Sequence, residues 1–141
     1  AKTDIILTPH PGEMSRLTKK PVPEILTTLE QSAETFAKRF HVICVLKDFH
    51  TVTAVSDGMT YVNLSGNNGM ATAGSGDVLS GIVGGLLVQW QDTKKAAAYG
   101  AFIHGLAGDM AFDNTGSYGM IASEIIDGLD KVWIKVEKNG N

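Results

Sequence analysis

The chain has little cysteine and no long apolar run, and both scarcities restrict the kind of protein it can be. Its one cysteine, Cys44, lies inside the apolar run VICVL, so no disulfide can form within the chain and the side chain is expected to be buried. No segment has the roughly 18 consecutive apolar residues of a membrane span, and the first residues lack a signal-peptide pattern. These features predict a cytoplasmic protein in a reducing compartment.

Basic charge is also scarce. Lys and Arg number 12 against 15 Asp and Glu, which gives a formal net charge of -3. Without a basic surface, neither nucleic acid nor an anionic membrane is expected as a partner. The hydrophobic fraction of 43%, with 19% charged residues, is typical of a globular core, and 141 residues suit one domain.

The first half of the sequence predicts a parallel crossover unit. Residues 4–8, DIILT, form a short strand that ends at the turn sequence PHPGE. Apolar residues then recur at helical spacing from Pro23 to Phe40, and HVICVLK at 41–47 is a β-rich run expected to be covered on both faces. Strand, helix and strand in this order favour two parallel strands.

The pattern then changes to a hairpin followed by helices. Residues 51–55 and 59–64 flank SDG, which predicts two antiparallel strands joined by a tight turn. Three helical stretches follow, at about 77–90, 94–112 and 121–136. The predicted fold class is therefore α/β, with the order βαβββααα.

The segment GNNGMATAGSGDVLSG at 66–81 is rich in glycine and leads into an apolar helical pattern. Glycines before a helix start let several backbone N–H groups converge on one point, where the helix N-terminus adds partial positive charge. Such a cradle binds phosphate and stabilises charge in phosphoryl transfer. Asp77 would repel a phosphate there, but its carboxylate can accept the proton of an attacking hydroxyl. The segment predicts phosphoryl transfer with Asp77 as the base.

A purely structural role for Asp77 is the alternative, because an Asp behind a glycine turn is a common helix N-cap. The helix that follows is apolar nearly all round. This predicts a helix buried on all sides, with Gly81, Gly84 and Gly85 in close contact with its neighbours.

Three pieces of the chain together resemble the ADP/ATP-dependent NAD(P)H-hydrate dehydratases of the ribokinase-like superfamily. They are TPHPGEMSRL at 8–17, LKDFHTVTA at 46–54 and GNNGMATAGSGDVLSGI at 66–82, in the order and spacing of that family. The resemblance implies a ribokinase-like three-layer α/β/α fold, of which residues 1–141 would be a partial domain. The N-terminal strands and helices of the family fold would be missing, and one sheet edge would be uncovered. Such an edge predicts a homo-oligomer or association with the missing N-terminal half.

The resemblance also implies repair of a damaged cofactor. Family members use ADP or ATP to return hydrated NADH or NADPH to its reduced form. Asp77 would take the proton of the ring hydroxyl while the hydroxyl oxygen attacks the terminal phosphate of the nucleotide. The N–H groups of Gly74, Ser75 and Gly76 would hold that phosphate. Magnesium would arrive with the nucleotide rather than in a cage of carboxylates.

Position by position, the resemblance assigns site residues but no metal ligand. The substrate contacts would be His10, Glu13 and Asp77. The nucleotide contacts would be Lys47, Asp48, Phe49, His50, Thr51, Gly74, Ser75 and Gly76. Two positions depart from the family pattern: Asp48 stands where glycine is usual, which adds negative charge near phosphates, and Asn68 where proline is usual. His104, in a helix rich in Ala and Gly, is expected to be a hydrogen-bonded core histidine without chemistry.

Two other functions remain open. One is a small-molecule kinase of the same superfamily, although sugar kinases usually carry an acid where this chain has Ala71, and hydroxyethylthiazole kinases usually have Cys where it has Asp77. The other is a noncatalytic nucleotide-binding fragment. A kinase would release a stable phosphorylated product, whereas the dehydratase would release inorganic phosphate.

Overall fold

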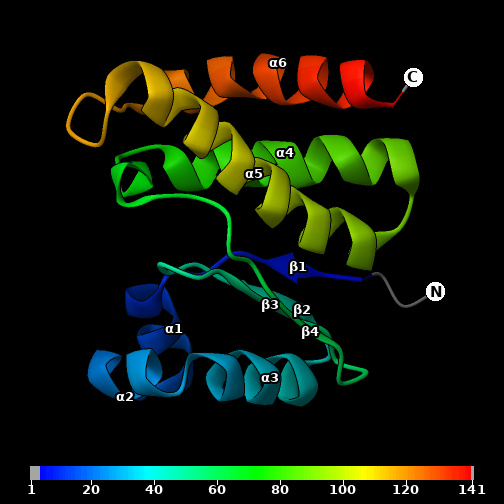
Figure 1. Cartoon of the computed structure of the whole chain (residues 1–141). Coiled ribbons are helices and arrows are strands. Elements are labelled where there is room, and N and C mark those ends of the chain that lie inside the picture. The colour runs from blue at the N-terminus through cyan, green and yellow to red at the C-terminus, as the bar shows by residue number, and fades with distance from the viewer. Residues whose placement is uncertain (1–3, 141) are drawn as a thin grey trace.

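The computed structural model describes residues 4–140 and places a four-stranded sheet between two groups of helices (Figure 1). The strands are β1 (Ile6–Leu7), β2 (Ile43–Leu46), β3 (Val52–Ala54) and β4 (Thr60–Val62), and they lie side by side in chain order. β1 and β2 are parallel, whereas β3 is antiparallel to both β2 and β4. The parallel crossover and the hairpin predicted from the sequence are both confirmed.

Three helices, rather than the single predicted one, connect β1 to β2. They are α1 (Pro11–Thr18), α2 (Val22–Thr27) and α3 (Leu29–Phe40). The expected helix is interrupted at Thr28, whose backbone leaves the helical region at φ -131° and ψ 43°. The sequence PHPGE, expected to be a turn, instead begins helix α1, because His10 caps its first turn.

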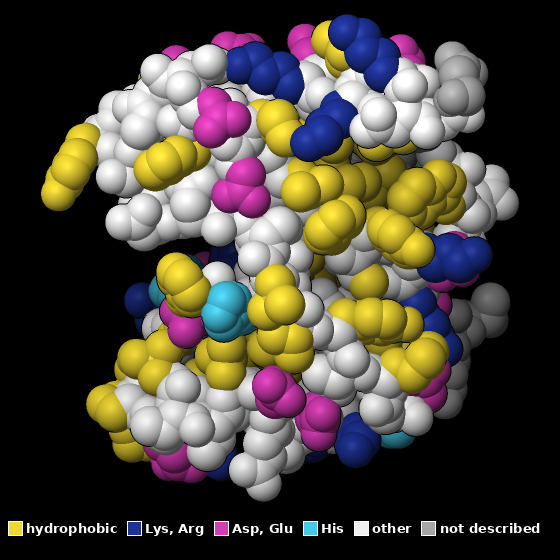
Figure 2. Space-filling model, viewed as in Figure 1, with side chains coloured by type: hydrophobic (Ala, Val, Ile, Leu, Met, Phe, Trp, Pro, Cys, Tyr) yellow, Lys and Arg dark blue, Asp and Glu magenta, His cyan; other side chains and the backbone are white. Residues whose placement is uncertain are grey.

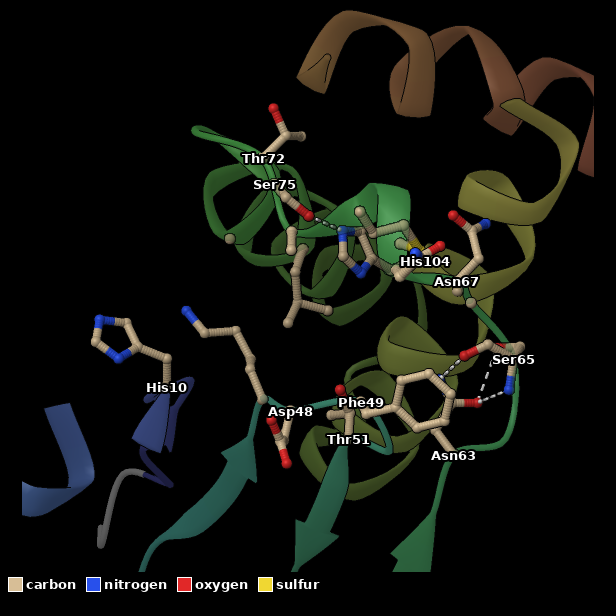
Figure 3. Close-up of a pocket in the computed structure, with 18 of the residues that line it drawn as sticks. His10, Asp48, Phe49, Thr51, Asn63, Ser65, Asn67, Thr72, Ser75 and His104 are labelled. Carbon is tan, nitrogen blue, oxygen red and sulfur yellow. Dashed lines mark hydrogen bonds between the residues drawn. The ribbon is translucent and has the colours of Figure 1, made fainter. Parts of the chain in front are cut away.

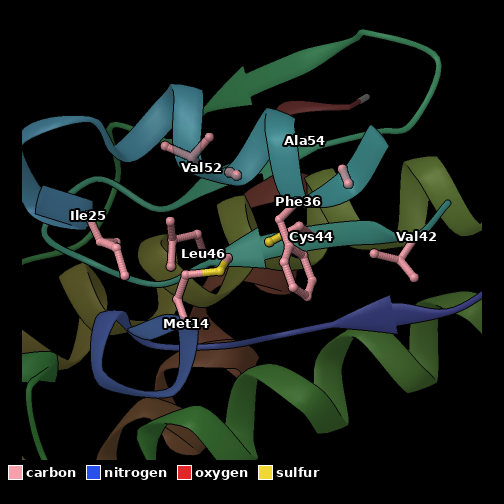
Figure 4. Packing of buried hydrophobic residues seen from close by; sticks show 10 residues of the cluster. Met14, Ile25, Phe36, Val42, Cys44, Leu46, Val52 and Ala54 are labelled. Carbon is pink, nitrogen blue, oxygen red and sulfur yellow. The ribbon is translucent and has the colours of Figure 1, made fainter. Parts of the chain in front are cut away.

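Strand β2 is buried on both faces, as its continuous apolar sequence predicts. Cys44 and Leu46 point into one core cluster with Phe36 of α3, shown in Figure 4. Ile43 and Val45 point the other way, into a cluster that includes residues of the second group of helices. Each fully buried side chain of this size contributes about 1.5–3 kcal/mol to stability, so β2 anchors both layers to the sheet.

The second group consists of a short 3₁₀ turn and three helices. These are η1 (Asn68–Met70), α4 (Ser75–Trp90), α5 (Thr93–Thr115) and α6 (Ala122–Asn139). Helices α4 and α5 cover the face of the sheet opposite α3, and α6 lies on the far side of them (Figure 1). The three predicted helical stretches are confirmed to within a few residues at each end.

The prediction that α4 is buried on all sides is wrong. Leu79, Val83 and Leu86 are buried, but a stripe on the opposite side of the helix faces solvent. A Cβ atom added at Gly84 would meet no atom within 4 Å among the described residues, and Val88 is 79% exposed. Glycine counts as apolar in the sequence but has no side chain to bury, so the apolar composition of α4 overestimates how much of the helix is buried.

The outer strands of the sheet are β1 and β4, and neither pairs with a further strand among residues 4–140. Ile5, just before β1, is 52% exposed, and Tyr61 and Val62 of β4 are 43% and 42% exposed. Within residues 4–140, no helix is both long and apolar enough to span a membrane.

Candidate active site

A cavity of about 580 Å³ lies between the end of strand β2, the loop after β4 and the first turn of α4. The surface is hollowed at this place in Figure 2, and Figure 3 shows the interior. His10 and Asp48 approach it from the sheet side, while Ser75 and His104 line it from the helices (Figure 3). The volume is in the range of small-molecule binding sites.

The first turn of α4 has the glycine geometry expected of an anion cradle. Gly74 is the N-cap residue, and its φ of 86° is a left-handed conformation that favours glycine. The N–H of Ser75 donates to the Thr72 carbonyl at 3.2 Å, and that of Asp77 to the Gly74 carbonyl at 3.0 Å. Among residues 4–140, the N–H groups of Gly74 and Gly76 have no acceptor. Two of the three N–H groups predicted to hold a phosphate are therefore available, and of these two residues only Gly76 lines the cavity.

Lys47 brings its ammonium group to the same place. A Cβ atom built on Gly76 would lie 2.9 Å from Lys47 Nζ, so the absence of a side chain at Gly76 allows this approach. The Lys47 backbone N–H donates to the Pro9 carbonyl at 2.8 Å, which fixes the start of the side chain at the end of β2. Positive charge and a free N–H thus converge at the N-terminus of α4, and both favour an anion there.

Asp77 is exposed and does not line the cavity. It occupies the third helical position of α4, so the alternative that it is the N-cap is wrong, since Gly74 holds that position. The preceding residue, Gly76, does line the cavity. The carboxylate therefore lies at the outer side of the same helical turn whose inner side carries the anion cradle.

His10 and Glu13 form a reciprocal capping box at the start of α1. His10 Nδ1 accepts hydrogen bonds from the N–H groups of Gly12 and Glu13 at 3.0 and 3.2 Å, and Glu13 Oε2 accepts one from the His10 N–H at 2.8 Å. The backbone hydrogen bond from His10 is the main cause that lowers the pKa of Glu13, and the Lys47 ammonium, 3.9 Å from Glu13 Oε2, adds to it. His10 lines the cavity, whereas Glu13 does not.

The predicted nucleotide segment follows β2 and lies at the rim of the cavity. Lys47, Asp48, Phe49 and Thr51 line it, whereas His50 does not. Phe49 is 70% exposed, and its ring lies 4.6 Å from that of His50 in an edge-on arrangement. The segment thus presents one cation, one carboxylate and one aromatic ring to the cavity.

The wall of the cavity opposite this segment is stabilised by hydrogen bonds of polar residues that were not predicted as site residues. The Asn63 side chain donates to the Ala101 carbonyl at 3.1 Å and accepts from Ser65 Oγ at 2.8 Å (Figure 3). Asp109 of α5 accepts from the Gly66 N–H at 2.9 Å and from Asn67 Nδ2 at 3.0 Å. Asp109 is the one acid in the mostly apolar stretch 96–112 of α5, and this pattern was the available signal, because such an acid requires partners.

His104 of α5 also lines the cavity, and its Nε2 lies 3.3 Å from Ser75 Oγ (Figure 3). Burial lowers the pKa of His104 to about 4; a hydrogen bond to the Ser75 backbone opposes this shift, and the Lys47 ammonium adds to it. The imidazole is therefore neutral at neutral pH. The prediction of a hydrogen-bonded histidine is confirmed, but its partner is the residue that begins α4.

Over residues 4–140, no three His, Cys, Asp or Glu side chains are grouped so as to hold a metal ion. Mg²⁺ binds proteins through one or two carboxylates together with substrate phosphates and water. Asp48 is the one carboxylate among the residues that line the cavity. This donor set fits a magnesium ion that is held mostly by a bound nucleotide.

Comparison with known proteins gives a consistent result. A family model described as NAD(P)H-hydrate dehydratase matches residues 1–131. A bifunctional NAD(P)H-hydrate repair enzyme of Thermofilum pendens is 46% identical over 126 residues, which cover 89% of this chain and 24% of that protein. An ADP-dependent (S)-NAD(P)H-hydrate dehydratase of Bacillus subtilis is 35% identical over 133 residues, which cover 94% of this chain and 48% of that protein.

Solved structures agree with these relatives. The B. subtilis ADP/ATP-dependent NAD(P)H-hydrate dehydratase, co-crystallised with ATP and Mg²⁺, superposes with a TM-score of 0.90 at 35% identity and covers 94% of this chain. A ribokinase-like superfamily protein of Enterococcus faecalis gives a TM-score of 0.73 at 30% identity. The chain spans 48% and 44% of those two structures, so it matches about half of each. The predicted ribokinase-like α/β fold is confirmed.

Proposed function

Because this chain belongs to the NAD(P)H-hydrate dehydratase family, we propose that it carries the phosphoryl-transfer site of a nucleotide-dependent dehydratase that repairs hydrated NADH and NADPH. One observation carries the proposal: Lys47 Nζ lies against Gly76, whose N–H has no acceptor among residues 4–140, and the exposed carboxylate of Asp77 follows in the same helical turn. Residues 1–141 would act as part of a ribokinase-like domain, since the B. subtilis dehydratase is about twice as long as this chain.

The two sides of this turn suit two different substrates. ADP or ATP would occupy the cavity, with its terminal phosphate between the Gly76 N–H and the Lys47 ammonium. The remaining nucleotide contacts would come from Asp48, Phe49 and Thr51 at the rim. His50, Gly74 and Ser75 complete the proposed nucleotide set. Magnesium bound to the nucleotide would neutralise part of the phosphate charge.

The hydrated nicotinamide would approach from the outer side, where Asp77 is exposed, and contact His10 and Glu13. Asp77 would accept the proton of the ring hydroxyl while the hydroxyl oxygen attacks the terminal phosphorus of the nucleotide. The bond between that phosphorus and the bridging oxygen of the nucleotide breaks in the same step. The phosphate then leaves with the former hydroxyl oxygen, and loss of a proton from the adjacent ring carbon restores the double bond. Phosphorylation is useful because hydroxide is a poor leaving group and phosphate a good one.

The test is recovery of dihydronicotinamide absorbance from hydrated NADPH with magnesium and ADP or ATP, beside the B. subtilis relative as positive control. The Asp77→Asn variant should keep nucleotide binding and lose turnover, because it retains the shape of the side chain without its basicity. Asp127→Asn, an exposed acid on α6, is the matched control. Full turnover by Asp77→Asn would exclude the catalytic assignment.

A noncatalytic nucleotide-binding module is the second candidate, because this chain spans 48% of the B. subtilis relative and would then lack part of the substrate wall. Nucleotide binding without loss of hydrated NADPH would support this reading. Accumulation of a stable phosphorylated product from another alcohol would instead support a small-molecule kinase.

A further inference from the structure

His104, which is half-buried, and Ser75, which is buried, form a polar pair behind the anion cradle. The Ser75 side chain begins α4 and the residue is 8% exposed, while His104 belongs to the middle of α5. Their atoms Oγ and Nε2 are 3.3 Å apart, and both residues line the cavity (Figure 3). Ser75 Oγ makes no other hydrogen bond within residues 4–140.

The direction of this hydrogen bond decides what Ser75 offers to a ligand. A neutral imidazole carries one proton, and the tautomer is set by its partners. If the proton is on Nδ1, Nε2 accepts the Ser75 O–H, and the serine presents only lone pairs to the cavity. If the proton is on Nε2, the imidazole donates to Ser75 Oγ, and the serine hydrogen is free to donate to an anion.

One feature of the site favours the proton on Nε2 once an anion is bound. A hydrogen bond from a hydroxyl to an anion is charge-assisted and stronger than one from a hydroxyl to a neutral imidazole nitrogen. The Lys47 ammonium at Gly76 and the N-terminus of α4 favour an anion beside Ser75, so the serine hydrogen turns to the anion and Ser75 Oγ accepts from Nε2–H.

We propose that His104 is a positioning residue whose Nε2–H donates to Ser75 Oγ and thereby directs the Ser75 hydroxyl hydrogen at an anion bound in front of α4. The identification of this anion as the terminal phosphate of a nucleotide rests on the proposed function. The anion cradle then has three donors of different kinds, namely the Gly76 N–H, the Lys47 ammonium and the Ser75 hydroxyl. His104 remains neutral and does not touch the anion through Nε2.

The tautomer can be observed directly in the chain saturated with inorganic phosphate. Long-range ¹H–¹⁵N NMR spectra at pH 7 should show His104 with its proton on Nε2, and the signals are assigned by their absence in His104→Gln. A proton on Nδ1 would overturn the proposal, because Ser75 would then be the donor in the pair.

Binding of inorganic phosphate and of ADP, measured by calorimetry, tests the consequence. His104→Leu and Ser75→Ala should each weaken phosphate binding by about tenfold, the loss expected for one hydrogen bond to an anion. The double variant should lose no more than either single variant, because both changes remove the same donor. His104→Gln should restore affinity to within about threefold, since its amide N–H can replace Nε2–H. Ser123→Ala, an exposed serine of α6, is the control.

The outcomes separate this proposal from the proposed function. Additive losses in the double variant, or wild-type phosphate affinity in His104→Leu, would overturn the role of His104 even if the chain turns over hydrated NADPH. Phosphate binding that depends on His104, without ADP binding or turnover, would keep the role and remove the proposed function. Absence of both phosphate binding and ADP binding by the wild-type chain would overturn both. The melting temperatures of all variants show whether a loss of phosphate affinity comes from a less stable fold.

Discussion

Acidification from pH 7 to pH 5 should destabilise the protein through His104. Its pKa is lowered in the folded state from an ordinary 6.5 to about 4, mainly by burial. The unfolded chain therefore binds a proton on this imidazole at a pH where the folded chain does not. Proton binding to the unfolded state alone favours unfolding, so stability is complete above pH 6.5, falls as the pH drops toward 4, and levels off below that.

The size of the effect follows from the two pKa values. A difference of about 2.5 pKa units corresponds to about 3 kcal/mol once both states are protonated, and to about 2 kcal/mol at pH 5. This is a large share of the 5–15 kcal/mol by which a domain is usually stable. With a urea m-value of about 2 kcal/mol/M, the midpoint of unfolding should fall by about 1 M between pH 7 and pH 5 from this group alone.

Urea unfolding followed by tryptophan fluorescence at several pH values measures this, and His104→Gln is the comparison. Glutamine cannot titrate, so the variant should lose about 2 kcal/mol less than the wild type between pH 7 and pH 5. Other histidines and the carboxylates titrate in both proteins and cancel in the difference. Parallel stability curves for the two proteins would refute the reasoning, because His104 would then have the same pKa in both states.

Three further predictions concern packing and the cavity wall. Gly128→Ala should destabilise the protein by about 1–3 kcal/mol, because the new Cβ would lie 2.1 Å from the Ala107 carbonyl oxygen. Gly84→Ala should stabilise it by up to about 1 kcal/mol, because the new Cβ meets no atom within 4 Å among the described residues and alanine favours a helix. Thermal unfolding of the two variants measures both effects. Asp109→Ala removes the acceptor of two hydrogen bonds and should lower the free energy of urea unfolding by about 2 kcal/mol. It should also speed amide exchange in the loop at Gly66 and Asn67, and an unchanged exchange rate there would contradict this role. Cys44, whose pKa burial raises to about 12, should react with a disulfide reagent only at the rate of unfolding, and rapid reaction in native buffer would exclude its burial.

The sequence predicted those parts of the fold that depend on local patterns. The run ICVL alternates between two core clusters, and its β-rich, continuous apolar character indicated a strand covered on both faces. The turn at Asp57 and Gly58 followed from the usual hairpin signal, and Gly58 has the expected positive φ of 101°. Helix α1 was missed because its N-cap is His10, a residue outside the usual set of capping side chains, although Glu13 stands at the capping-box position.

The site was predicted less completely because its walls depend on contacts between distant segments. The residues after β2 and those at the start of α4 were assigned to one nucleotide site through the family resemblance, whereas the glycine pattern alone indicated only the anion cradle at α4. The pairing of Ser75 with His104 joins positions 29 apart, and that of Gly66 with Asp109 joins positions 43 apart. No local rule specifies such pairs, so the only signal was a polar residue in an apolar helix, which indicates a partner without naming it.

The charges around Gly76 explain why a carboxylate is compatible with a phosphate site in the proposed reaction. Inside the cavity, the Lys47 ammonium and a free N–H lie at the start of α4, while Asp77 lies on the exposed side of the same turn. High-dielectric solvent around Asp77 weakens its repulsion of a bound phosphate to the order of 1 kcal/mol or less at about 4 Å or more, whereas the cavity side is less well screened. If Asp77 instead pointed into the cavity, it would compete with the phosphate for Lys47. The proposed base is therefore on the side of the helix turn where it can meet a second substrate without displacing the first.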